Sequence, residues 1–142
     1  MKYFSWTLFS MFLLFANQSA TATEQGHSLK HEHNQIEVST MADKPSVKLH
    51  AMQDDMSGWN IHIETINFRF APENVNSHPT AGEGHAHLYV NGKKIARVYS
   101  PWFFMNELPA GTHSLKVTLN ANDHSRLVLH GEPVADSLDI SQ

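Results

Sequence analysis

From residue 46 onward, apolar and polar residues alternate with a period of two, which is typical of strands with one buried face. Residues 47–52 and 59–64 follow this pattern on either side of a turn at residues 54–58. The pattern predicts that one face of each segment points into a core. The apolar positions are Val47, Leu49, Ala51, Trp59, Ile61, Ile63, Leu115, Val117 and Leu119.

The most specific local signal is a β-hairpin over residues 85–98, centred on Asn91-Gly92. Asn-Gly is typical of a type I′ turn, since both central residues need a positive φ. A two-residue loop pairs Val90 with Lys93 and places His87 opposite Ala96. That small partner leaves room beside the imidazole.

The remaining chain continues with short segments and turn signals, and no apolar repeat of 3.6 residues persists beyond residue 45. About seven or eight strands at this spacing predict an all-β fold, a single antiparallel β-sandwich that is immunoglobulin-like or cupredoxin-like. We expect this domain to occupy residues 46–142. The other expected strands are at residues 67–70, 126–130 and 134–140, residues 101–105 are either an aromatic loop or a short irregular strand, and a long loop is expected at residues 74–84.

The N-terminal segment has the features of an export signal. Lys2 precedes an apolar stretch, and Ala20-Thr21-Ala22 is a small-residue cleavage pattern, so residues 1–22 are expected to be a signal peptide. An uncleaved anchor is the alternative. Cleavage predicts a periplasmic or secreted product without a stable membrane span, whose residues 23–45 form a flexible polar tail. The tail contains His27, His31 and His33.

Composition narrows the chemistry. The 142 residues include 11 histidines and no cysteine, with a formal net charge of −4. The mild acidity provides no basic footprint for nucleic acid. The lack of cysteine excludes disulfides, thiolate nucleophiles, cysteine-based zinc sites and lipoprotein acylation. Histidine is therefore the residue type that most needs explaining.

Two histidines two positions apart on a strand leave the same face, so His85 and His87 can converge on one ion. His124 follows a polar turn near a strand end and is expected to complete a metal site. Met105 and His113 are further possible ligands. Tyr89 and Glu83 are expected to orient the ligands, because a ligating imidazole usually donates its other N–H to an oxygen. The alternative is that both histidines lie on an exposed sheet face.

Three other features have competing interpretations. His50, Met52 and His62 form either a second metal-binding group or an exposed strand pair. The aromatic segment at residues 102–104 is either core or a surface that binds a protein, glycan or membrane partner. Hydrolase, zinc-protease and phosphate-loop motifs are absent, so no enzyme is predicted, although a metal-dependent activity stays open.

One part of the chain resembles a known group of proteins. The segments GEGHAHLYVNGKKIARVY, LPAGTHSLKVTL and NANDHSRLVLHGEPV are similar to those of small exported bacterial β-sandwich domains of uncharacterised family, some of which occur beside copper-handling proteins. The resemblance implies an immunoglobulin-like fold and copper association, and it points to His85, His87 and His124. Dense methionine runs, which copper carriers often have, are missing here.

Together these features predict an exported transition-metal-binding protein that binds or delivers copper in the periplasm, with zinc as the alternative metal. A protein partner for metal transfer is expected. The alternative is a non-catalytic structural or interaction module that uses its aromatic segment. The oligomeric state is left open.

Overall fold

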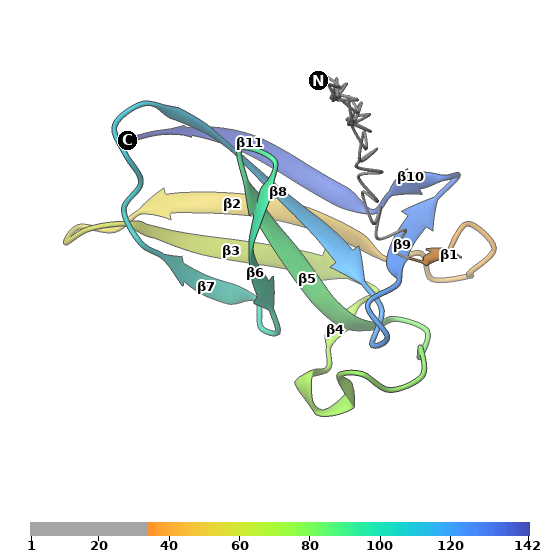
Figure 1. Ribbon diagram of the computed structural model, residues 1–142. Coiled ribbons are helices and arrows are strands. Elements are labelled where there is room, and N and C mark those ends of the chain that lie inside the picture. Colours follow the sequence, from red (N-terminus) through yellow and green to blue (C-terminus); the bar gives the residue numbers. More distant parts are fainter. Residues whose placement is uncertain (1–33) are drawn as a thin grey trace, which may run out of the picture. The chain divides into compact units, whose positions relative to one another are not determined.

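Two packed β-sheets build the part of the chain that the computed structural model describes, residues 34–142 (Figure 1). The smaller sheet contains β2 (Ser46–Gln53), β3 (Trp59–Ile66) and β7 (Trp102–Met105). The 8-stranded sheet contains β1 (Gln35–Glu37), β4 (Arg69–Phe70), β5 (Glu83–Val90), β6 (Lys93–Val98), β8 (Thr112–Asn120), β9 (Arg126–Leu129), β10 (Glu132–Pro133) and β11 (Ala135–Ser141).

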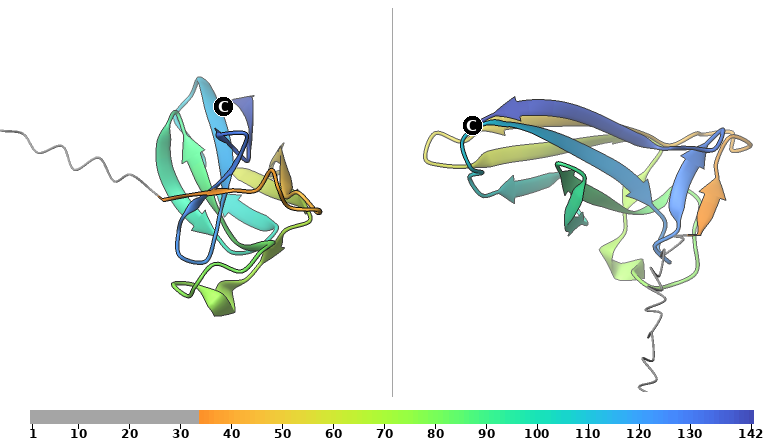
Figure 2. Two further views of the ribbon diagram at one scale, coloured as in Figure 1. Left: turned by 90° about the vertical axis from the view of Figure 1, so that its right-hand side faces the viewer. Right: turned by 45° about the horizontal axis from the view of Figure 1, so that its top comes forward.

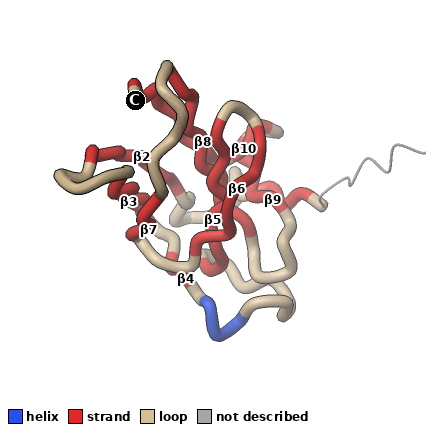
Figure 3. The backbone as a smooth tube through the Cα atoms, turned by 60° about the vertical axis from the view of Figure 1, so that its left-hand side comes forward, coloured by secondary structure: helices blue, strands red, loops and turns tan. Residues whose placement is uncertain are grey.

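The predicted all-β sandwich is confirmed. The helical part of residues 34–142 is the single 3-10 turn η1 (Pro72–Asn74), which interrupts the loop between β4 and β5 (Figure 3). Most pairings are antiparallel, as expected, but β1 pairs with β9 and β4 pairs with β5 in parallel. Both parallel pairs are short, and the strands β1 and β10 were not expected from the sequence.

The hydrophobic core lies between the two sheets, and the alternating positions predicted from the sequence supply it. Leu49, Ile61 and Ile63 of the smaller sheet are almost fully buried. They belong to one apolar cluster with the inward-facing residues of β5 and β8. Each buried Leu, Ile or Val side chain contributes about 1.5–3 kcal/mol to folding through the removal of apolar surface from water. The members from β5 and β8 are Ala86, Leu88, Val90, Leu115, Val117 and Leu119.

The hairpin of β5 and β6 has the predicted turn. Asn91 and Gly92 have φ values of 49° and 78°, and Val90 pairs with Lys93. Beyond this point an irregularity between Leu88 and Tyr89 shifts the register.

The expected pairing of His87 with Ala96 is therefore wrong. His87 pairs with Arg97, and Ala96 pairs with Leu88 instead. An extra residue on one strand of a pair displaces every later partner, and the turn sequence does not reveal it. The shift places a guanidinium, rather than a methyl group, across from the histidine.

Part of the expected tail belongs to the sheet. β1 pairs with β9, and Val38, which follows β1, is 1% exposed. The Glu37 carboxylate accepts hydrogen bonds from the backbone N–H groups of His130 and Gly131, each at 3.0 Å. A strand this short does not show the alternation of apolar and polar residues that identifies strands in a sequence. The expected start of the domain at residue 46 is therefore too late.

The predicted signal peptide and the tail histidines His27, His31 and His33 lie outside the described residues. Within residues 34–142, no helix is long and apolar enough to cross a membrane.

The backbone of β5 lies close to the end of β8 at Gly84. A Cβ atom built on Gly84 would lie 2.0 Å from the backbone oxygen of Asn120, at a φ of +156°. Backbone atoms cannot move aside as the end of a flexible side chain does. The absence of a side chain at Gly84 therefore permits close packing of the β5 and β8 backbones at the end of the sheet next to His85.

We expect Gly84→Ala to destabilise the protein by roughly 2 kcal/mol or more, because the added methyl group separates two backbones in a packed region. Gly111→Ala is the matched control, since Gly111 also has a positive φ (+136°) but nothing within 4 Å of its Cβ position. Chemical unfolding measures both. Equal losses in the two variants would show that backbone conformation, not close approach, sets the cost.

Candidate metal centre

His85 and His87 lie on β5 and project from the same face of the larger sheet. The outward face of β5 is covered as well as the inward one, so His85 and His87 are only 1% and 2% exposed. The alternative of an exposed histidine pair is therefore wrong. The ring nitrogens of a buried imidazole are kept from water, so they need other polar partners. The neighbouring turn provides one.

The turn between β8 and β9 carries His124. Its backbone is in the left-handed region, with φ of 72°. The side chain of Asp123 holds the turn by accepting from the backbone N–H and the hydroxyl of Ser125, both at 2.9 Å. The Asn120 amide donates to the carbonyl of His124 at 3.2 Å. These bonds stabilise an uncommon conformation that aims the imidazole at β5.

The three imidazoles converge. Nε2 of His85 lies 3.1 Å from Nε2 of His87 and 3.2 Å from Nδ1 of His124. One nitrogen from each ring lies within 4.8 Å of the others. The sequence-based expectation that these residues come together is confirmed; metal binding itself stays a prediction.

Two of the three nitrogen separations suit a transition-metal ion, and the third, between His87 and His124, is at most 4.8 Å. Two nitrogens bound at about 2.0 Å are roughly 2.9 Å apart at a right angle and about 3.3 Å apart at a tetrahedral angle. The two contacts of His85 lie between these values. A single proton on His85 Nε2 points at one neighbour, whereas a cation accepts lone pairs from all three rings. The donor set therefore fits a cation.

Asn76 orients the third ligand. Nε2 of His124 lies 2.7 Å from Oδ1 of Asn76, and an amide oxygen only accepts, so this nitrogen carries the proton. Nδ1 is then left with its lone pair directed at His85. The backbone N–H of Asn76 also donates to the carbonyl of Asn122 at 2.9 Å, which joins the loop after η1 to the turn of His124 (Figure 2).

The electrostatic environment favours neutral imidazole at His85. Burial lowers its pKa to about 4, and the positive charges of His124, Arg97 and Lys94 add to this shift. The cation Arg97 is the residue that the bulge brings opposite His87. A neutral ring keeps the lone pair that a metal ion requires.

The other predicted ligands lie elsewhere. Met105 is 4% exposed and belongs to the apolar core, so it fills space instead of presenting sulfur to the cluster. His113 lies near the start of β8, where its Nδ1 accepts from the Asn91 amide at 3.0 Å and its Nε2 donates to the Pro109 carbonyl at 2.7 Å. Both fall outside the group of three converging histidines found within residues 34–142.

The expected orienting residues also differ. The carboxylate of Glu83 pairs with Arg69 at 2.7 Å and accepts from Asn74 at 2.7 Å. The Tyr89 ring lies near His87, with 6.4 Å between ring centroids. Asn76, which sequence reasoning missed, takes the orienting role at His124. Its contact spans 48 positions of the chain, and no local spacing signals it.

The second histidine group forms part of an aromatic row on the smaller sheet. His50 and His62 are stacked with centroids 5.6 Å apart, and His62 stacks on Trp102 at 4.3 Å. His50 Nε2 also lies 3.0 Å from a Glu64 carboxylate oxygen. Met52 of the same group is 44% exposed.

No protein-family model and no curated protein sequence matches this chain. Among solved structures, it is similar to the M60 catalytic domain of ZmpC from Clostridium perfringens, which was solved in complex with the sialyl T antigen. The TM-score is 0.38 at 11% identity, over 80% of this chain. This chain spans only 18% of that structure's length.

We expect the metal-free protein to lose stability as the pH falls from about 6.5 to about 4. Below the ordinary histidine pKa of about 6.5 the unfolded chain binds a proton at this position, whereas folded His85 stays neutral until its pKa of about 4. Stability therefore rises with pH across this window. Chemical unfolding at several pH values, with an NMR titration of the His85 ring, measures both quantities.

His85→Asn should flatten this part of the pH profile, while His78→Asn, at an exposed loop position, should leave it unchanged. A His85 ring that titrates near pH 6.5 in the folded protein would contradict the environment described here.

Proposed function

We propose that this chain is an exported transition-metal-binding protein that holds one ion through His85, His87 and His124 and passes it to a partner protein in the periplasm. The observation that carries the proposal is the convergence of three imidazole nitrogens within 4.8 Å, two of them from buried histidines. Burial keeps the rings of His85 and His87 from water, which suits a site that holds an ion.

The donor set guides the choice of metal. Imidazole nitrogen suits copper, zinc, nickel and iron, while thioether and thiolate sulfur favour copper(I). Met105 is in the core and the chain has no cysteine. We therefore infer copper(II) as the cargo, with zinc as the alternative.

Binding and delivery fit the arrangement better than catalysis. Three ligands leave at least one coordination position open, and His124 is partly exposed at the rim of the site. An incoming ligand of a partner protein can enter there. The converging set found in residues 34–142 holds no carboxylate that would serve as a general base.

Titration of the purified protein with copper(II) and with zinc tests the proposal. We expect stoichiometric, submicromolar binding that is lost in a His85→Ala/His87→Ala variant. Asn76→Ala should weaken binding by roughly 10- to 100-fold, because the residue fixes the orientation of a ligand rather than coordinating the ion itself. X-ray absorption should find metal–nitrogen distances of about 2.0 Å.

A variant with His27, His31 and His33 changed to Ala is the matched control and should keep the tight site. Circular dichroism establishes that each variant is folded. Equal weak binding by the protein and by the His85→Ala/His87→Ala variant would assign the metal to the tail histidines and refute the proposal.

A second candidate function, an interaction module, is favoured by one observation. Trp102 and Phe104 are 55% and 53% exposed on the outer face of β7, while Phe103 packs against the core. Half-exposed aromatic side chains next to the stacked histidines provide a flat apolar surface. Such side chains are frequent in binding surfaces.

If this surface binds a partner, the fluorescence of Trp102 should shift to shorter wavelength on addition of that partner. Phosphatidylcholine vesicles and soluble oligosaccharides are suitable probes, and a Trp102→Phe variant measures the contribution of the other tryptophans, which is subtracted. Phe104→Ser should weaken the response without changing metal binding. An unchanged spectrum with both probes would count against membrane and glycan partners.

A further inference from the structure

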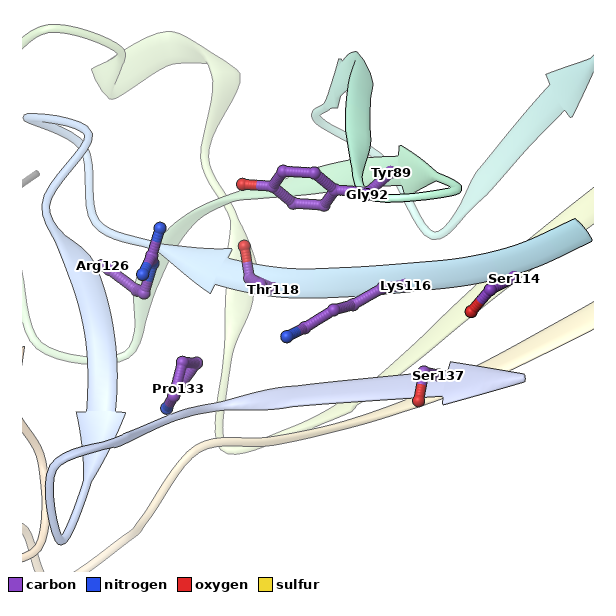
Figure 4. Close-up of a pocket in the computed structure, with 8 residues that line it drawn as sticks. All are labelled: Tyr89, Gly92, Ser114, Lys116, Thr118, Arg126, Pro133 and Ser137. Atoms are coloured by element: carbon purple, nitrogen blue, oxygen red, sulfur yellow. The ribbon is translucent and has the colours of Figure 1, made fainter. Parts of the chain in front are cut away.

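A polar pocket lies on the outer face of the larger sheet, beside the histidine cluster. Its volume is about 360 Å³, and β5, β8, β9, β10 and β11 contribute to its lining. Figure 4 shows the polar ends of Tyr89, Thr118 and Arg126 turned toward the same space, with the Lys116 ammonium farther along β8. A pocket of this size accepts a small molecule rather than a single water molecule.

The charge of the pocket is positive although the chain as a whole carries −4. Lys116 and Arg126 both line it, and no lining residue is acidic. The nearest acidic side chain on the same face of β11 is Asp139, which pairs with Ser114 and lies outside the lining. Two cations in the lining favour the binding of an anion.

Neither cation forms an ion pair with the described part of the protein. Within residues 34–142, the side chains of Lys116 and Arg126 take part in none of the ion pairs, and Arg126 Nε is buried without a hydrogen-bond partner. Two cations in one pocket that form no ion pair create a positive potential, which a bound anion lowers.

We propose that this pocket binds the phosphate group of a small phosphate ester. Three donors from three strands surround the space: the Arg126 guanidinium, the Lys116 ammonium and the Tyr89 hydroxyl. A phosphate presents three peripheral oxygens in different directions, whereas a carboxylate presents two in one plane. The volume leaves room for a small organic group beside the phosphate.

The pocket and the histidine cluster share one face of the sheet. His87 pairs with Thr118, and Tyr89 pairs with Lys116 two residues farther along the same two strands. A chain of hydrogen bonds also joins them: Thr118 donates to the Asn120 side chain at 3.0 Å, and Asn120 donates to the His124 carbonyl at 3.2 Å. The phosphate site nonetheless stands on its own residues and does not depend on metal binding.

Isothermal titration of the chelator-treated protein with inorganic phosphate and with glycerol phosphate tests the proposal, because removal of metal prevents phosphate from binding an ion at the histidines. We expect saturable one-site binding of both probes and weaker binding of acetate. Arg126→Gln and Lys116→Gln should each weaken phosphate binding by about tenfold, the usual effect of removing a hydrogen bond to a charged group.

Lys93→Gln is the matched control, since it removes the same charge at the exposed start of β6, outside the pocket. It should leave the affinity unchanged. Thermal unfolding of the three variants establishes that they are folded, and a Tyr89 ring shift in NMR spectra on addition of phosphate would place the ligand. Equal weakening by Lys93→Gln, equal affinity for acetate, or no saturable binding would overturn the proposal.

Discussion

The antiparallel pairing of β5 with β8 is the constraint on which the rest of the structure depends. Paired residues share a face of the sheet, so this one register assigns every side chain of both strands to the core or to the outer face. Leu88 and Val117 pair on the inner face, whereas His87 and Thr118 pair on the outer one. A slip by one residue would exchange the two sets. The close approach at Gly84 helps to hold the register at the end where His85 lies.

The outer face differs from an ordinary solvated face in its burial. His85 and His87 are almost completely removed from water, and burial with nearby cations holds His85 neutral. A neutral imidazole keeps the lone pair that a metal ion requires, so the burial of His85 suits a ligand. On the same outer face, Lys116 and Arg126 form no ion pair within the part of the chain that the structure describes.

Much of the fold follows from local pattern. The alternation in residues 46–64 and at Leu115, Val117 and Leu119 predicted the inner faces of both sheets, and Asn91-Gly92 predicted the hairpin turn. The local pattern did not predict two short or irregular features. These are the bulge that moves Arg97 opposite His87, and the strand β1 at the edge. Neither has a period long enough to read, since each depends on pairing with a distant strand.

The candidate site divides in the same way. His85 and His87 share a face because strand geometry dictates it, and the sequence by itself determined that much, together with the absence of any thiolate ligand. Only the tertiary structure decided that His124 reaches them, that Asn76 directs its lone pair, and that Met105 is in the core. The physical reason is that these contacts join segments far apart in the chain, and their geometry depends on packing that no local pattern encodes.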